Sequence, residues 1–233
     1  NMSYYRNHLP IAGASGQSTG YTINQSIRFN DDDSAYLSRT HSASNKRTFT
    51  FSCWIKRGNL GGYQRLFNAV DAGDNESFIF RDDAPANRLQ FYSGDATVDL
   101  KTNRLFMDTA AWYHIILNVD TTQTVTSERV RIYVNGIREE SFATETYPAK
   151  DAQTAFNGNV VHEIGRSAGS GQYLDGYMAE IHFLDGYAYD SSYFGEFNDI
   201  GIWIPKKYSG SYGTNGFYIK GQSSGALGND SSG

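Results

Sequence analysis

Residues 180–185, with the sequence EIHFLD, come closest in this chain to a set of acidic groups able to cleave a glycosidic bond. Such cleavage requires two carboxyl groups that flank the scissile bond. In a strand, Glu180 and His182 would share one face, but a histidine then stands where the second carboxylate is needed. Asp185 precedes Gly186, where the strand is expected to end. The segment therefore favours a strand with a polar face over a hydrolytic site.

Other catalytic arrangements fail on residue type or on spacing. The single cysteine, Cys53, lies in an alternating segment, which predicts a buried core residue rather than a nucleophile. The segment GASGQSTG lacks the lysine of a phosphate-binding loop. The five histidines are too scattered for a metal site, and His114 is expected to make a structural hydrogen bond. We therefore expect a protein without enzymatic activity.

Tyrosine side chains are the most numerous candidates for binding a ligand, since the chain has 17 tyrosines. Glycan binding needs aromatic rings beside polar groups that fix the orientation of the sugar. Tyr63, Tyr92 and Tyr173 each lie close to an expected loop and are candidate glycan-binding residues. Tyrosine is equally expected at protein–protein contacts. For the aromatic cluster between Tyr187 and Trp203, we favour packing against the rest of the protein or a neighbouring subunit.

Composition excludes several classes of protein. The formal net charge is -5 and basic residues form no block, which argues against a nucleic-acid partner. No apolar run reaches the length of roughly 18 residues that a membrane-spanning helix needs, so no membrane insertion is expected. The first residues lack the basic and apolar segments of a secretory signal. A single cysteine in a chain of 233 residues fits assembly in a reducing cytoplasm.

The candidate residues must be positioned by strands, because short alternating segments recur about every 10 residues with turn-forming residues between them. In residues 47–57, Phe49, Phe51, Cys53 and Ile55 would form one face. Residues 112–120 and 129–134 alternate in the same way, with a dry face toward a core and a wet face that carries His114 and Asn118. Between residue 134 and the next strand, Asn135-Gly136 predicts a type I′ hairpin turn.

The remaining segments predict a central domain with two additions. Residues 1–20 are expected to form an N-terminal arm or linker, residues 21–190 the domain, and residues 191–233 a C-terminal extension that packs on the domain or a neighbour. Residues 143–158 are expected to form a polar loop. In residues 177–184, Tyr177, Ala179, Ile181 and Phe183 would lie on one face and the alternate residues on the other.

Five segments, in their order along the chain, resemble the laminin-G-like branch of the concanavalin A-like lectin/glucanase superfamily. They are SIRFNDDDSAYLSRT, TFTFSCWIKRG, FMDTAAWYHIILNVDTT, RIYVNG and YLDGYMAEIHFLDG. The resemblance covers residues 21–190. It implies an all-β fold, a two-sheet antiparallel jelly-roll sandwich. Glucanases of this superfamily carry an E-x-D-x-x-E pattern, which residues 180–185 do not reproduce.

The tail, with IGIWIPKKYSGSYGTNGFYIK and the ending GALGNDSSG, resembles structural proteins of bacteriophages, especially marine ones. This resemblance implies a non-enzymatic structural or adhesion protein of the virion, such as a fibre, tail or capsid-decorating component. Copies of the same chain, other virion proteins and host-surface glycan are then the expected partners. A carbohydrate-binding lectin module is the alternative function, and a glycoside hydrolase of the same superfamily is a third.

The resemblance also implies a candidate calcium site, because some laminin-G-like domains bind calcium at the sandwich rim through side-chain and backbone oxygens. Asp71 and Asp74 in one loop, and Asp82 and Asp83 in another, are the candidate calcium ligands. Neither loop matches a motif of the family, and capping of turns by aspartate is the alternative explanation. No other cofactor is expected.

Overall fold

A computed structural model describes residues 20–71, 74–95, 97–167, 170–222 and 225–233. Within these residues the chain is almost entirely strand and loop, with two short 3-10 helices at Thr126–Glu128 and Ser191–Tyr193. The strands are β1 (Ile27–Phe29), β2 (Leu37–Thr40), β3 (Thr48–Arg57), β4 (Gln64–Asp71), β5 (Asp74–Phe80), β6 (Arg88–Tyr92), β7 (Asp99–Leu105), β8 (Tyr113–Asp120), β9 (Val130–Val134), β10 (Ile137–Arg138), β11 (Phe142–Thr146), β12 (Val161–Ile164), β13 (Gly176–Asp185), β14 (Gly195–Phe197), β15 (Trp203–Pro205) and β16 (Phe217–Ile219).

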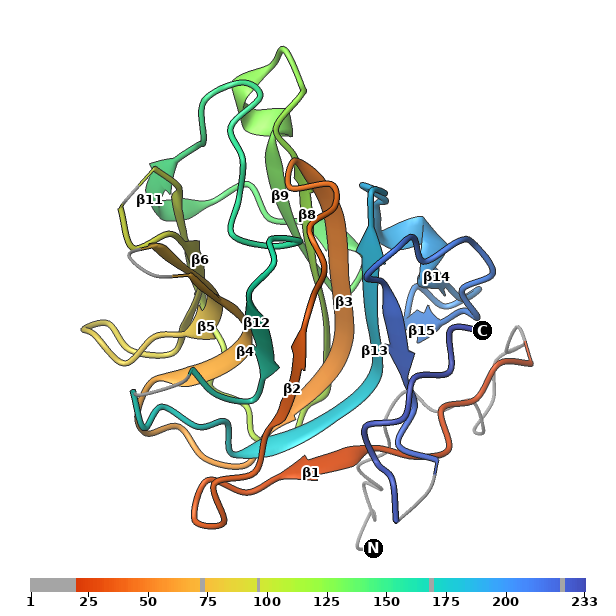
Figure 1. The fold of residues 1–233 in the computed structure, drawn as a ribbon. Coiled ribbons are helices and arrows are strands. Elements are labelled where there is room, and N and C mark those ends of the chain that lie inside the picture. The colour runs from red at the N-terminus through yellow and green to blue at the C-terminus, as the bar shows by residue number, and fades with distance from the viewer. Residues whose placement is uncertain (1–19, 72–73, 96, 168–169, 223–224) are drawn as a thin grey trace, which may run out of the picture.

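Two antiparallel sheets face each other and form a sandwich (Figure 1). Sheet A has the strand order β1-β13-β3-β8-β9-β10, and β16 also pairs with β13. Sheet B has the order β11-β7-β6-β5-β4-β12-β2. The expected fold class, an all-β two-sheet sandwich, is therefore confirmed. Among the described residues, no helix is long and apolar enough to cross a membrane.

The core lies between the sheets and is built by the alternation that the sequence shows. Phe49, Phe51, Cys53 and Ile55 of β3 are completely buried in one apolar cluster, together with side chains of sheet B such as Phe67. Alternate residues of a strand point to opposite faces, so one strand delivers a whole row of apolar groups to the core. Burial raises the pKa of the Cys53 thiol, which keeps it protonated and unreactive.

The Asn135-Gly136 turn forms as expected between β9 and β10. Both residues have positive φ, 48° at Asn135 and 84° at Gly136, as a type I′ turn requires. Gly136 meets a second constraint, because a Cβ atom at this position would overlap the indole ring of Trp203. Trp203 belongs to the C-terminal segment, so the turn also serves as a docking point for that segment.

The expectation of a wet outer face on sheet A is wrong. His114 and Asn118 lie on that face, yet both are buried. The C-terminal region covers them, since Trp203 bonds to His114 and the Tyr189 carbonyl accepts a bond from Asn118. The ribbon of this region lies beside β13 (Figure 1). Phe194 and Tyr208 of this region pack with Ile116 of β8 in a second apolar cluster. Sheet A is therefore buried on both faces, like the central layer of a three-layer protein.

Hydrogen bonds through His114 hold the C-terminal region against sheet A. Trp203 Nε1 donates to His114 Nδ1 over 3.0 Å, and His114 Nε2 lies 2.9 Å from Ser52 Oγ. Because Nδ1 accepts, the neutral imidazole carries its proton on Nε2, which donates to Ser52. Burial lowers the pKa of His114 to about 3, so the ring stays neutral near pH 7. The structural hydrogen bond expected of His114 is thus present.

Two local expectations also fail. Residues 143–158 are not all loop, because β11 pairs with β7 at the edge of sheet B. The sequence of β11 shows no clear alternation of apolar and polar residues, because its threonine and glutamate residues lie on an edge strand beside solvent. In β13, Met178 rather than Ala179 shares the core with Ile181 and Phe183. The alternation breaks because β13 contains a bulge opposite β3.

Replacing Trp203 by alanine should lower the free energy of unfolding by about 3–5 kcal/mol, since it removes a buried ring. It also leaves His114 Nδ1 without its donor. Trp203→Phe keeps most of the packing and should cost less. Chemical denaturation measures both, with Val125→Ala, at an exposed position outside the C-terminal region, as a control that changes stability by less than about 0.5 kcal/mol. Equal stability of Trp203→Ala and wild type would contradict the docking of this segment.

Candidate functional site

The bulge in β13 places an acidic side chain at a pocket. Between the pairs Ala179–Trp54 and His182–Ser52, β13 has two residues where β3 has one. Glu180 sits in this bulge with a φ of 48°, the left-handed region that costs a glutamate about 1–3 kcal/mol. Bulges re-aim side chains and occur often at functional sites. Here the bulge directs Glu180 to the outer face of sheet A.

Two tyrosines from opposite ends of the chain hold the Glu180 carboxylate. Tyr21 donates to Oε2 over 2.5 Å, and the Tyr218 hydroxyl lies 2.7 Å from both Oε1 and Oε2. The two hydroxyl oxygens are 2.9 Å apart. Tyr218 is on β16, which pairs with β13 so that Tyr218 stands opposite His182. The carboxylate therefore ties both ends of the described chain to the bulge.

His182 contacts both Tyr218 and the Glu180 carboxylate. Its ring stacks on Tyr218 with centroids 4.2 Å apart, and its Nε2 lies 3.6 Å from Glu180 Oε2. Nδ1 is 3.0 Å from the Tyr212 hydroxyl. Burial lowers the pKa of His182 below its usual value, although Glu180 opposes this shift. We take the ring as neutral near pH 7, so it positions Tyr218 and Glu180 without adding charge.

The protonation states of the cluster follow from burial and hydrogen bonding. Burial raises the pKa of Glu180, but bonds from His182, Tyr21 and Tyr218 outweigh it and lower the pKa below its ordinary value. Burial and the neighbouring Glu180 raise the pKa values of Tyr21 and Tyr218. Glu180 is therefore an ionised acceptor near pH 7, and the two hydroxyls remain donors.

These groups line a cavity of about 510 Å³, which we call the Glu180 pocket. The Lys220 ammonium lies 4.8 Å from the centre of the Tyr218 ring. Amide and hydroxyl side chains complete the wall: Thr22, Asn24, Gln25 and Gln222. Among the described residues that line the pocket, Glu180 alone carries a carboxylate. The pocket thus offers donors, acceptors and two aromatic rings to a polar ligand.

The sequence analysis named Glu180 only as part of an incomplete acidic pattern and did not predict a site there, and it missed the residues around it. Tyr21 and Tyr218 are 197 positions apart, and Tyr218 lies in a segment that shows no pattern beyond a short apolar piece. Their meeting depends on β16 joining sheet A, which local alternation does not encode. The only local signal was the interruption of the apolar pattern by Glu180 and His182 in β13.

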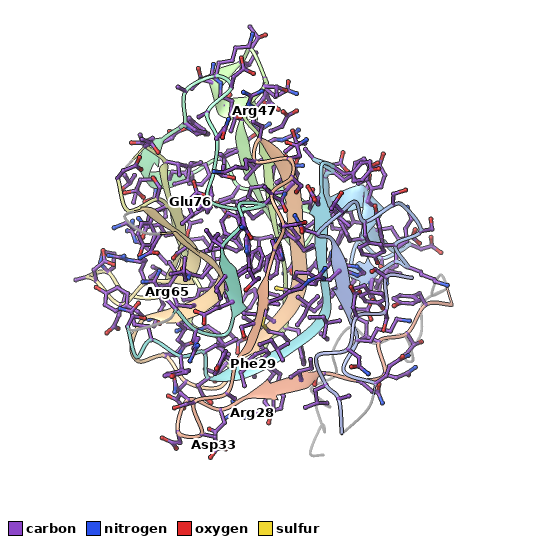
Figure 2. The ribbon with its side chains drawn as sticks, viewed as in Figure 1. Arg28, Phe29, Asp33, Arg47, Arg65 and Glu76 are labelled. Atoms are coloured by element: carbon purple, nitrogen blue, oxygen red, sulfur yellow. The ribbon has the colours of Figure 1, made fainter. Side chains whose placement is uncertain are left out.

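The predicted glycan-binding tyrosines lie elsewhere, on the face of sheet B opposite the core. The Arg81 guanidinium lies over both Tyr63 and Tyr92, 4.7 and 5.6 Å from the ring centres. Arg65 donates to the Tyr92 hydroxyl over 2.8 Å. Figure 2 shows Arg65 on the far side of the sandwich from the C-terminal cover. The structure thus brings Tyr63 and Tyr92 together, with guanidinium groups stacked on their rings.

Tyr173 is not part of that pair. It hydrogen-bonds with Arg166, which also forms an ion pair with Glu163. The preceding residue, Gln172, accepts a 2.8 Å bond from Arg65 Nε, so this segment borders the same face of sheet B. Binding of glycan by Tyr63, Tyr92 and Tyr173 stays a prediction.

The candidate calcium ligands fall into two groups. Asp83 pairs with Arg81 at 2.6 Å and with Lys101 at 2.8 Å. Burial opposes ionisation of Asp83, but these two cations lower its pKa to about 2. Asp71 and Asp74 stand opposite each other at the ends of β4 and β5, and their side chains lie outside the described residues.

No group of three or more acidic, histidine or cysteine residues that could hold a metal occurs in the described part of the chain. Asp82 lies close enough to Arg57 to interact with it electrostatically. With Asp83 held by two cations, a calcium ion in this loop would have to displace them. Calcium binding by Asp71, Asp74, Asp82 and Asp83 stays a prediction.

Removing one hydroxyl should change the titration of Glu180. Tyr218→Phe takes away a donor to both carboxylate oxygens, so the pKa of Glu180 should rise. A carboxyl whose folded pKa lies below its unfolded value stabilises the protein above the unfolded pKa, and this contribution disappears as the pH falls through the folded pKa. The variant should therefore lose stability in acid at a higher pH than wild type.

Carbon-13 NMR of the Glu180 carboxyl measures this pKa directly. Tyr193→Phe is the matched control, because Tyr193 is an exposed tyrosine of the C-terminal region that stacks on Tyr189. An unchanged or lower pKa of Glu180 in Tyr218→Phe would contradict the assigned hydrogen bonds.

Comparisons with known proteins agree with this architecture. Among solved structures, the chain is similar to a protein from Bacteroides ovatus provisionally described as carbohydrate binding, with a TM-score of 0.56 and 15% identity. The match covers 85% of this chain and 52% of that one, so this chain spans about half the length of that protein. No curated protein sequence matches the chain.

Two further structures share the fold. Domain 4 of AbnA, a GH43 extracellular arabinanase from Geobacillus stearothermophilus in complex with arabinotriose, has a TM-score of 0.50 at 15% identity, over 76% of this chain and 78% of that one. The enzymatically active domain of tailspike protein 2 from bacteriophage CBA120 has a TM-score of 0.51 at 12% identity, over 72% of this chain and 26% of that one. At these identities the likeness concerns the fold alone.

The sequence profile described as the concanavalin A-like lectin/glucanases superfamily, Laminin_G_3, matches residues 29–188. The matched segment begins at Phe29, the last residue of β1, and extends just past the end of β13, so it contains both sheets except β16 and most of β1. Because it accounts for more than half of the chain, the protein belongs to this superfamily, as a laminin-G-like member.

Proposed function

We propose that this protein is a non-enzymatic adhesion module that binds carbohydrate, and that the Glu180 pocket holds the sugar. The observation that carries the proposal is the pocket itself, where one carboxylate, two tyrosine hydroxyls and several amides converge around 510 Å³ of space. Volumes of about 300–1,000 Å³ are typical of small-molecule sites.

A sugar fits the chemistry of these groups. Its hydroxyls both donate and accept, so they can bond to a carboxylate and to amide side chains such as Gln25 and Gln222. Glu180 is partly accessible, with 11% of its side chain exposed, and it has lone pairs beyond those used by Tyr21 and Tyr218. Lys220 adds a cation that favours a ligand with an acidic substituent.

The same geometry supports binding over hydrolysis. Cleavage of a glycosidic bond needs two carboxyl groups, and in the part of the pocket lining that the structure describes only Glu180 has one. A general acid needs a raised pKa, whereas the pKa of Glu180 is lowered. The His182 ring is neutral, and its Nδ1 lies 3.0 Å from the Tyr212 hydroxyl. A lectin is therefore favoured over a glycoside hydrolase.

Glu180→Gln tests the proposal with little change in side-chain volume. It replaces an ionised acceptor by an amide, and a hydrogen bond to a charged group contributes about 1.5–3 kcal/mol. Glycan affinity should therefore fall by about tenfold or more. Glycan arrays identify the ligand for wild type, and calorimetry measures the affinities of the variants.

Tyr92→Ala is the matched variant for the alternative surface on sheet B. It should leave glycan affinity unchanged if the Glu180 pocket is the site. Loss of binding in Tyr92→Ala but not in Glu180→Gln would move the site to Tyr63 and Tyr92. Arrays with and without a chelator separate calcium-dependent binding, and arrays blank under both conditions would exclude a lectin. Release of sugar by wild type would exclude a non-enzymatic protein.

A second proposal concerns the larger assembly, a bacteriophage particle in which the chain serves as a fibre, tail or capsid-decorating component. The resemblance of the tail to phage structural proteins supports it, and the CBA120 tailspike shares the fold. A specific surface also favours assembly with copies of itself or other virion proteins. The β14–β15 hairpin exposes Phe197, Ile200 and Ile202, with 50%, 66% and 47% of their surfaces accessible.

Three neighbouring apolar side chains at a hairpin tip suit a protein contact, since exposed apolar groups gain by burial. The double variant Ile200→Asp/Ile202→Asp should therefore dissociate an assembly of this protein into monomers. Size-exclusion chromatography with light scattering measures the molar mass. Val125→Asp, at another exposed apolar residue, is the control that should leave the assembly intact. A strictly monomeric wild type would contradict self-assembly through this hairpin.

A further inference from the structure

A second cavity, of about 270 Å³, opens at the side of the sandwich, and we call it the lateral cavity. It lies where β2, the edge strand of sheet B, approaches β16, an edge strand of sheet A. Its walls are mostly apolar, with side chains from both sheets: Leu37, Phe67, Ile164, Phe217 and Ile219. It is therefore a lateral entrance to the core.

One polar group in this cavity stands out. His41 is 1% exposed, and neither of its ring nitrogens has a hydrogen-bonding partner among the residues that the structure describes. Its ring stacks on that of His162, with centroids 3.6 Å apart and planes inclined by 14°. His162 differs, because Asn157 N donates to its Nε2 and its Nδ1 lies 3.0 Å from Val160 O. The Asn157 side chain approaches His41 without forming a bond of normal geometry.

The charge state of His41 limits what it can bind. Burial, with the neighbouring His162 and Arg39, lowers its pKa to about 2, so the imidazole is neutral near pH 7. A neutral imidazole has one donor and one acceptor. A buried polar group without a partner is costly, and in native proteins such a group usually bonds to water or a ligand.

We propose that the lateral cavity binds a compact, largely apolar molecule with a single hydroxyl group, of the alcohol or phenol class, whose hydroxyl bonds to His41. The five apolar walls match the body of such a molecule. A hydroxyl both donates and accepts, as a neutral imidazole does. A cavity of about 150 Å³ holds benzene, so this larger one accommodates a substituted phenol.

The rim of the cavity allows entry. Arg39 and Asp230 form an ion pair of 3.6 Å there, and 47% and 39% of their side chains are exposed. Exposed pairs of this kind contribute little to stability and separate easily. Gly228 lies against Leu37 at the same rim. Opening therefore requires only small movements of surface groups.

The lateral cavity is separate from the Glu180 pocket, although both use β16. Phe217 and Ile219 face the core and line the lateral cavity, while Tyr218 between them faces outward to Glu180. This follows from the alternation of side chains along a strand. The inference does not depend on glycan binding, because the residues concerned are different.

Fluorine-19 NMR with 4-fluorophenol and with fluorobenzene tests the proposal on the whole chain. Wild type should bind 4-fluorophenol saturably. His41→Phe keeps a ring of similar shape but removes both nitrogens, so it should weaken 4-fluorophenol about tenfold and leave fluorobenzene unweakened. Leu37→Trp fills the rim from a partly exposed position and should abolish binding of both probes. The nitrogen-15 shifts of His41 should move on addition of 4-fluorophenol to wild type.

Val125→Ala, at an exposed position that does not line the cavity, is the control that should bind both probes as wild type does. Absence of saturable binding to wild type would overturn the proposal, and would leave water as the partner of His41. Unchanged 4-fluorophenol affinity in a folded His41→Phe would overturn the role of the imidazole. Should His41→Phe fail to fold, undiminished binding by Leu37→Trp would overturn the location.

Discussion

Burial of both faces of sheet A is the constraint on which the rest of this structure depends. One face packs against sheet B, and the other is covered by the C-terminal region through the line from Trp203 to His114 and Ser52. The neutral imidazole at its centre accepts one bond and donates the other, so both partners are fixed in orientation. After the segment that covers this face, the chain continues into β16, which joins sheet A. Residues of β16 line both cavities.

The bulge at Glu180 is the second determinant, and it depends on the first. A glutamate in the left-handed region is strained, and such strain persists only where the surroundings hold it. Here the bonds from Tyr21 and Tyr218 hold the carboxylate, and His182 holds Tyr218 by stacking. Without β16 beside β13 the carboxylate would lose Tyr218 as a donor, and His182 would lose the ring on which it stacks. The Glu180 pocket therefore needs residues of the C-terminal region, such as Tyr218, as well as residues of the sandwich.

The two sheets differ in how their second faces are used. On sheet B, Arg81 lies over Tyr63 and Tyr92 and pairs with Asp83, and Arg65 lies over Tyr92. On sheet A, the C-terminal region packs apolar side chains against the sheet, and the Glu180 pocket lies beside this packing. The Glu180 pocket and the lateral cavity are both lined by residues of β16.

The sequence by itself determined the architecture. Alternation in residues 47–57 predicted the core face of β3, and Asn135-Gly136 predicted the turn after β9, because both features depend on neighbouring residues. The motifs between residues 21 and 190 predicted the superfamily.

Only the tertiary structure decided which faces are wet, where β13 changes register, and which side chains meet Glu180 and His41. The solvent exposure of His114 depends on a segment that begins more than 70 residues later, and the partners of Glu180 come from both ends of the chain. A strand pattern shows how its own side chains alternate. It contains no information about the distant segment that covers them, and this is why the sites could not be derived from sequence.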